Sequence, residues 1–143
     1  MNSIPGILEF MEDIKTFISH NDKFALHCGI ELLDASAGEA TARMTIDNQH
    51  LNGLKTAHGG VIFTLADLAF AAAANSRGQT AVGINAVISY IRPALPGDTL
   101  YARAREMFSN RTISGYSVEV ENEEGSLVAC FQGTAFKKVA ALY

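Results

Sequence analysis

The chain has 143 residues, so it has room for one domain and not for a barrel that needs roughly 250 residues. Hydrophobic residues make up 48% of the sequence and charged residues 18%, a composition typical of a folded globular protein and unlike that of a disordered one. The net charge of −4 gives no general attraction to phosphate backbones or anionic membranes, so we expect no nucleic-acid or membrane partner.

A helix is expected near the N-terminus, because apolar residues recur there at steps of three and four with acidic residues between them. The apolar positions of this helix are Ile7, Phe10, Met11, Ile14, Phe17 and Ile18. Asn21-Asp22 is expected to end it, and a second short helical piece reaches Cys28-Gly29. We expect this helical segment, 1–28, to pack on the rest of a single domain, 1–143.

Extended stretches and one long helix are expected in the rest of the chain. Stretches 30–36 and 40–46 flank Ala37-Gly38-Glu39 and predict a β-hairpin, whereas 47–57 has no periodicity and predicts a loop. In 58–75 apolar residues cover all sides of a helical wheel, so this helix must be surrounded by the rest of the protein. Four more strands are expected at 80–92, 98–108, 112–121 and 126–138.

These elements predict an α+β fold in which an antiparallel sheet wraps around one long central helix. The strand after the helix carries Val82, Ile84, Val87 and Ile88 with almost no charge. Such a surface is covered by a ligand or by another subunit. We therefore expect a homo-oligomer.

Asp67 is the candidate catalytic residue, because it is the sole ionisable residue between His58 and Arg77. A carboxylate on an apolar helix loses hydration, which raises its pKa toward the range of a general base near neutrality. The alternative is that Asp67 faces solvent or makes a structural hydrogen bond.

The same helix begins with His58-Gly59-Gly60. Free N–H groups and the positive end of the helix dipole make such a turn a donor site for an anion or a developing oxyanion. The alternative is that the two glycines serve close packing alone. Asp67 lies about 12 Å further along a straight helix, too far to act on the same carbonyl. In a C2 dimer, Gly59 of one subunit would lie beside Asp67 of the other.

Neither the cysteines nor the histidines form a recognisable site. Cys28 and Cys130 have no CxxC partner, so we expect reduced, buried structural thiols, with a nucleophilic cysteine as the alternative. The histidines show no HExxH pattern and no close set of carboxylates or thiols, so no metal is expected. The GxSxG, GxGxxG and GxxxxGK[ST] motifs are absent, and no cofactor is expected.

A membrane span and an export signal are not expected. The longest apolar run, 68–74, is too short for a bilayer, which takes about 20 residues. The N-terminus carries Glu9, Glu12 and Asp13 in place of a basic region, which predicts a cytoplasmic protein.

Two segments, LNGLKTAHGGVIFTLADLAFAAAANSRG and INAVISYIRPALPGDTL, carry a specific combination of motifs. HGG is followed by LAD, with Asp67 nine residues after His58, and then by AFA and an Asn before a Gly. This combination resembles the hotdog-fold acyl-CoA thioesterases of the phenylacetic acid degradation type. The resemblance implies a helix wrapped by a sheet, homodimers paired into homotetramers, and hydrolysis of an acyl-CoA thioester.

The resemblance implies roles for individual residues. It places the oxyanion-binding glycine at Gly59, the catalytic carboxylate at Asp67, the motif histidine at His58 and an upstream amide at Asn52. His58 has an equally open alternative, that of ordering the start of the helix. Some relatives place a water-holding Ser or Thr on the next strand, where this chain has Gly83. The candidate substitutes are Asn85, Thr64 and Ser89.

The acyl group is expected in an apolar slot beside the central helix, where Gly60, Phe63 and Thr64 are the candidate substrate-binding residues. The helix offers no Lys or Arg, which favours neutral aryl or medium-chain acyl groups such as phenylacetyl. Arg92 and Arg111 are expected at the rim, against the CoA phosphates. CoA is then part of the substrate and not a cofactor.

The sequence leaves open the role of Asp67 in the chemical step and two alternative functions. Asp67 either activates water or attacks the thioester directly to give a mixed anhydride. The first alternative function is a hotdog-fold enoyl-CoA hydratase, for which Asp47 and His50 are the nearest acid and base. The second is a non-catalytic acyl-CoA-binding protein.

Overall fold

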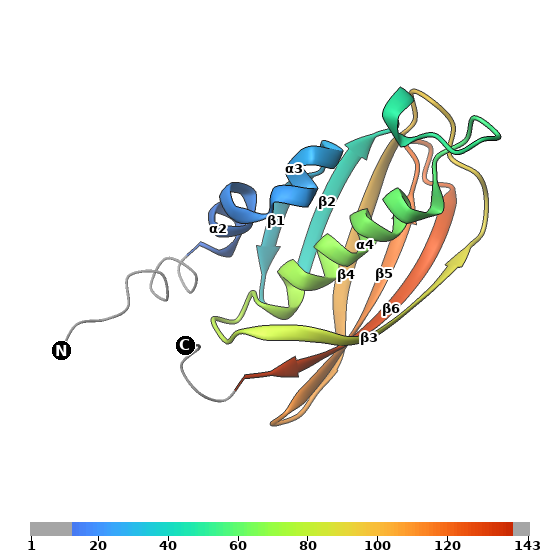
Figure 1. Ribbon diagram of the computed structural model, residues 1–143. Coiled ribbons are helices and arrows are strands. Elements are labelled where there is room, and N and C mark those ends of the chain that lie inside the picture. Colours follow the sequence, from blue (N-terminus) through green and yellow to red (C-terminus); the bar gives the residue numbers. More distant parts are fainter. Residues whose placement is uncertain (1–12, 139–143) are drawn as a thin grey trace.

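The computed structural model describes residues 13–138, and Figure 1 shows the arrangement of their elements. Two short helices come first, α2 (Ile14–Asn21) and α3 (Lys23–Cys28). Asp13 caps α2 and Asp22 caps α3, each by accepting a hydrogen bond from a backbone N–H in the first turn. The break between two helices is confirmed. The earlier part of the predicted first helix lies outside the described residues.

The strands within residues 13–138 form one antiparallel six-stranded sheet, in the order β1-β2-β4-β5-β6-β3. Their bounds are β1 (Glu31–Ser36), β2 (Glu39–Thr45), β3 (Ala81–Tyr90), β4 (Thr99–Ser109), β5 (Ile113–Glu121) and β6 (Leu127–Lys137). The predicted hairpin and the four later strands are therefore confirmed. Strand β3 pairs with β6 on one side and leaves its other edge without a strand in this part of the chain.

The long helix α4 (Gly59–Ala74) lies across the concave face of the sheet (Figure 1). Leu65, Ala66 and Ala69 on its sheet-facing side are fully buried. The predicted apolar helix and the sheet that wraps it are confirmed. The small alanine side chains of α4 allow the helix to approach the strands closely. The loop before α4 contains one short 3-10 helix, η1 (Asn48–His50).

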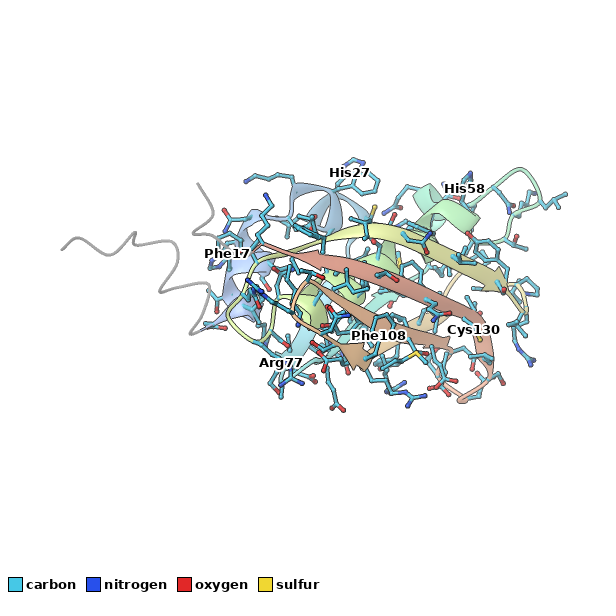
Figure 2. All side chains as sticks on the ribbon, turned by 90° about the horizontal axis from the view of Figure 1, so that it is seen from below. Phe17, His27, His58, Arg77, Phe108 and Cys130 are labelled. Carbon is cyan, nitrogen blue, oxygen red and sulfur yellow. The ribbon has the colours of Figure 1, made fainter. Side chains whose placement is uncertain are left out.

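Side chains alternate between the two faces of the sheet, and this alternation corrects one prediction. Ala129 and Phe131 on β6 are buried toward α4, so Cys130 between them points to the outer face and is exposed (Figure 2). The expectation of two buried thiols is therefore right for Cys28 and wrong for Cys130.

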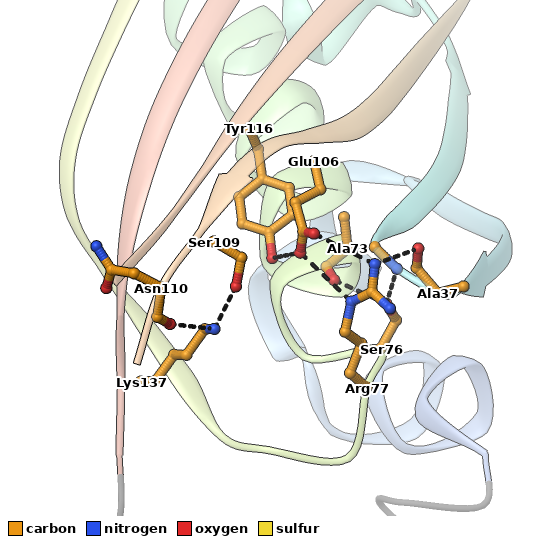
Figure 3. Close-up of polar contacts among 10 residues, drawn as sticks. Ala37, Ala73, Ser76, Arg77, Glu106, Ser109, Asn110, Tyr116 and Lys137 are labelled. Atoms are coloured by element: carbon orange, nitrogen blue, oxygen red, sulfur yellow. Dashed lines mark hydrogen bonds and ion pairs between the residues drawn. The ribbon is translucent and has the colours of Figure 1, made fainter. Parts of the chain in front are cut away.

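The segment after α4 is anchored by a polar cluster at the far end of the helix from Gly59 (Figure 3). Nη2 of Arg77 donates to the Ala37 carbonyl oxygen at 3.0 Å and to Oε1 of Glu106 at 3.2 Å. The Tyr116 hydroxyl donates to the other oxygen of Glu106 at 3.1 Å. These bonds tie the segment after α4 to the β1–β2 turn and to β4 and β5, and so fix the helix across the sheet.

Candidate active site

Hydrogen bonds hold the backbone at the start of α4, but one backbone N–H there has no acceptor among the described residues. The His58 N–H donates to the His50 carbonyl oxygen at 2.8 Å, and the His58 carbonyl oxygen accepts from the Val61 N–H at 3.0 Å. The Gly60 N–H donates to Nδ1 of His58 at 2.8 Å. No described residue accepts a hydrogen bond from the Gly59 N–H. At the positive end of the helix dipole, this N–H is a free donor for an anion or a developing oxyanion.

Gly59 lines an open pocket of ≈ 390 Å³ between the start of α4 and the end of β3. The other lining residues are Ala57, Ile62, Tyr90, Ile91, Arg92 and Pro93. Arg92 is exposed, and its Nε donates to the Leu127 carbonyl oxygen at 2.6 Å, which holds the guanidinium beside this pocket. Mostly apolar walls with one backbone donor and one cation suit a ligand with an apolar body and a polar or anionic end.

His58 is the N-cap of α4. Its Nδ1 accepts from the Gly60 N–H, so the hydrogen of the neutral ring lies on Nε2. The ring is exposed at the end of the molecule opposite Arg77 (Figure 2). The contacts within one chain therefore support the ordering role of His58.

Asn52 orders the loop before α4. Its Oδ1 accepts from the backbone N–H groups of Leu54 at 2.9 Å and Thr56 at 3.2 Å, and its Nδ2 donates to Oγ1 of Thr56 at 2.9 Å. A primary amide carries two N–H bonds, so one of them stays available. The half-buried side chain thus has one donor left for a substrate oxygen.

His50 is buried and has no free ring nitrogen. Its Nδ1 accepts from the Asp47 N–H at 2.9 Å, and its Nε2 pairs with the Cys28 carbonyl oxygen at 2.8 Å. The ring therefore joins η1 to the end of α3. With both nitrogens used in this way, the structure offers no support for His50 as the acid or base of a hydratase.

Asp67 lies on the side of α4 that faces away from the sheet. The residues of α4 that keep some exposure are Gly59, Gly60, Phe63, Thr64, Asp67, Ala71 and Ala74, here called the outer stripe of α4. The Asp67 side chain is exposed in a single chain, in contrast to the expectation that apolar neighbours enclose it. The reason is that its helix neighbours Phe63, Thr64 and Ala71 share the outer stripe and keep some exposure themselves, whereas the larger apolar side chains of α4 turn toward the sheet. Nearby protein atoms still remove part of its hydration, and this desolvation, with the negative charge of Asp22, raises the pKa of Asp67.

A comparison with known families decides the class of protein. Residues 54–129 match the family model described as the thioesterase superfamily, and this segment contains the loop after Asn52, the whole of α4, strands β3, β4 and β5, and the start of β6. The chain belongs to the thioesterase superfamily.

Curated relatives of this thioesterase cover most of its length. It is 38% identical over 117 residues to acyl-coenzyme A thioesterase PaaI of Escherichia coli, a match that covers 82% of this chain and 84% of the relative. It is 36% identical over 129 residues to a putative esterase of Archaeoglobus fulgidus, with 90% of this chain and 84% of the relative covered.

Solved structures share the fold of this thioesterase. The E. coli PaaI protein from the phenylacetic acid degradation operon has a TM-score of 0.88 at 33% identity, with 94% of this chain and 98% of that chain covered. A hypothetical thioesterase of Streptococcus pneumoniae with coenzyme A has a TM-score of 0.73 at 27% identity, with 76% and 88% covered. The predicted hotdog fold and the predicted thioesterase class are confirmed.

The predicted substrate-binding residues do not all lie together. Gly60, Phe63 and Thr64 lie on the outer stripe of α4, where the Phe63 ring packs edge-on against Phe131 at 5.4 Å between centroids. The Thr64 hydroxyl donates to the Gly60 carbonyl oxygen at 2.8 Å. Arg111 lies in the β4–β5 turn, at the end of the sheet away from Gly59, so one chain does not bring it to the pocket. Its role at the CoA phosphates stays a prediction.

The structure gives a reason for Gly83, where some relatives have Ser or Thr. A Cβ added there would lie 2.9 Å from Cε2 of Phe70, and one added at Gly133 would lie equally close to the same ring. Phe70 therefore fills the space of a side chain at this position. Among the candidate substitutes, Asn85 and Ser89 pair with Thr134 and Cys130 and face the outer side of the sheet, whereas Thr64 shares the outer stripe with Asp67.

Two residues near the site escape detection in the sequence. Asp22, the cap of α3, acts on Asp67 through its charge, and Tyr90 contacts Gly59. Asp22 lies outside the motif segments, and Tyr90 lies within the second of them without any role assigned to it. Both contacts join segments that are distant in sequence. Within residues 13–138 no three His, Cys, Asp or Glu side chains are grouped so that they can hold a metal ion. None of the helices in this part of the chain is long and apolar enough to cross a membrane.

Proposed function

We propose that this thioesterase hydrolyses aryl- or medium-chain acyl-CoA to the free acid and CoA. The free Gly59 N–H beside an apolar pocket carries the proposal, because thioester hydrolysis needs a donor where negative charge develops on the carbonyl oxygen. The E. coli relative named acyl-coenzyme A thioesterase and the streptococcal structure with coenzyme A support the acyl-CoA class.

We further propose that the enzyme is a homodimer built through β3, and that two dimers form a tetramer. Strand β3 has no neighbouring strand on one edge within residues 13–138. It is apolar, and its side chains Val82, Ile84, Val87 and Tyr90 are between 42% and 60% exposed. An exposed apolar edge strand favours pairing with another chain. Antiparallel pairing of two β3 strands about a two-fold axis would also cover the outer stripes of both α4 helices.

In such a dimer each active site draws on two chains. Gly59 and Asp67 of one chain lie about 12 Å apart along α4, too far to serve one thioester. The symmetric pairing brings Gly59 of one subunit toward Asp67 of its partner. Covering the outer stripe also removes water from Asp67, and this loss of hydration disfavours the charged form of its carboxyl group.

The chemical step follows from these positions. The thioester carbonyl oxygen accepts hydrogen bonds from the Gly59 N–H and from the remaining N–H of the Asn52 amide. Asp67 of the other subunit takes a proton from the water that attacks the carbonyl carbon, and the thiolate of CoA leaves. The same residues permit direct attack by Asp67, and labelled water oxygen entering the carboxylate in a single turnover identifies that route.

The charge of the site favours neutral acyl groups. Asp67 is the charged residue on the outer stripe of α4, and α4 carries no Lys or Arg. An anionic acyl group would therefore be repelled by the catalytic carboxylate. Arg92 at the pocket is placed to meet a phosphate of CoA, so the nucleotide end is expected at the rim.

A panel of CoA esters tests the proposed substrate class. With free CoA trapped through its thiol, phenylacetyl-, benzoyl- and medium-chain acyl-CoA are expected to give the highest kcat/KM. For succinyl-CoA we expect kcat/KM at least about tenfold lower, the scale of like-charge repulsion at a few ångströms. A preference for succinyl-CoA would contradict the proposal, and no hydrolysis of any ester would reject the activity.

The pH profile should respond to Asp22. The Asp67 carboxylate must be ionised to act, so kcat/KM falls as pH drops through its raised pKa. Removing the negative charge in Asp22→Asn lowers that pKa, and the acidic limb moves to lower pH. Asn also caps helices well, so α3 keeps its N-cap.

The matched control for this pH measurement is Asp34→Asn, at an exposed residue of β1, which should leave the acidic limb in place. An unchanged limb in Asp22→Asn would show that Asp22 does not act on the catalytic group.

A further inference from the structure

Tyr90, the last residue of β3, contacts the residue that carries the free N–H. Its hydroxyl donates to the Gly59 carbonyl oxygen at 2.8 Å. A Cβ added to Gly59 would lie 3.0 Å from the Tyr90 hydroxyl oxygen and 3.1 Å from its Cζ, so the ring lies directly against the Gly59 α-carbon. Tyr90 is nevertheless 51% exposed. Core packing does not hold this ring, so its hydrogen bond to Gly59 is not a by-product of burial.

The peptide group between Gly59 and Gly60 is held at both ends. Its carbonyl oxygen accepts from the Tyr90 hydroxyl, and its N–H donates to Nδ1 of His58 at 2.8 Å. The preceding peptide is held at its oxygen, since the His58 carbonyl accepts from the Val61 N–H. The Gly59 N–H thus projects from a backbone that is anchored on both sides, and this N–H has no acceptor among residues 13–138.

Such anchoring matters at a glycine. Gly59 has no Cβ, so its backbone dihedrals are less restricted than those of other residues, and rotation about them would turn the N–H away from the pocket. A donor stabilises an oxyanion best when it already points at the place where the charge develops and needs no reorganisation. A bond that limits this rotation therefore acts on the transition state more than on substrate binding.

We propose that the Tyr90 hydroxyl is a positioning group that holds the Gly59 amide in the orientation required for the oxyanion. This inference rests on the proposed role of the Gly59 N–H. Tyr90 acts through Gly59 and takes no part in proton transfer or bond formation. Since Tyr90 belongs to β3, the proposed dimer strand directly supports the donor end of the site.

Tyr90→Phe tests this role, because it removes the hydroxyl and keeps the ring. With phenylacetyl-CoA as substrate, we expect kcat to fall about fivefold to tenfold, the scale of one lost hydrogen bond, with KM within about twofold of wild type. We expect Tm to stay within about 2 °C of wild type, since the residue is half exposed. Tyr101→Phe is the matched control, because Tyr101 lies on β4 beneath the Arg103 guanidinium and away from Gly59. Its kcat should equal that of wild type.

Two outcomes overturn the inference: a kcat of Tyr90→Phe within twofold of wild type, or a change confined to KM, which would assign Tyr90 to substrate binding. Asp67→Asn, assayed in parallel, separates this result from a failure of the proposed site. A large loss in Asp67→Asn with normal Tyr90→Phe rejects the positioning role alone. Normal turnover in Asp67→Asn rejects the proposed site itself.

Discussion

Asp67→Asn is expected to lower kcat for acyl-CoA hydrolysis at least about a hundredfold, the scale of losing a general base. The raised pKa of Asp67 fits this role, since a more basic carboxylate takes a proton from water more readily. The amide has nearly the same shape and cannot accept that proton. The loss should appear in kcat with every acyl-CoA that the enzyme hydrolyses, because it concerns the attacking water and not the acyl group.

The fold should survive this substitution. Asp67 is exposed in one chain, and no salt bridge within residues 13–138 includes it. Tm of Asp67→Asn should therefore equal or slightly exceed that of wild type, because a carboxylate that is costly to desolvate is replaced by a neutral group. Asp34→Asn serves as the control for a surface carboxylate without this role. Near-normal turnover in a folded Asp67→Asn enzyme would contradict the assignment of the base.

The elements of the fold were predictable because their patterns are local. The apolar helix predicted at 58–75 is observed as Gly59–Ala74, since apolar residues on every side mark a helix that other elements must cover. The strand β4 alternates buried Ala102 and Ala104 with exposed Arg103 and Arg105, as period two requires. The same period places Cys130 outside, and the prediction erred by giving the apolar character of cysteine more weight than the alternation.

The contacts that build the site were not predictable, because they join positions far apart in the chain. Tyr90 meets Gly59 across 31 residues, and Phe70 fills the space beside Gly83 and Gly133 on two different strands. A sequence shows that Gly83 lacks a side chain but not which ring takes its place. The exposure of Asp67 likewise depends on what covers the outer stripe of α4, which no pattern within one helix reveals.

In the proposed dimer, one thioester would meet Gly59 of one subunit and Asp67 of the other. This explains why the exposed Asp67 and the free Gly59 N–H lie on one helix at a distance too large for both to act on the same thioester. In the proposed dimer, Asn52 and Gly59 would belong to the donor end of one site, and Asp67 to the base end of the site formed with the other subunit. On this proposal, each chain supplies one half to each of two sites. Substitutions at the two ends should complement one another in a mixed dimer.

Mixing two inactive variants, Asp67→Asn and Asn52→Ala, measures this directly. In a mixed dimer one site carries Asn52 and Asp67 unchanged, while the other site carries both substitutions. If subunits exchange at random, half of the dimers are mixed, and activity should recover to about a quarter of wild type. If Asn52→Ala disorders the loop before α4, this affects the site that already carries both substitutions and leaves the intact site working. Mixing Asp67→Asn with the double variant, Asn52→Ala with Asp67→Asn, is the control and should give no recovery. Mixed dimers that are separated by different tags and remain inactive would contradict a site shared between two chains.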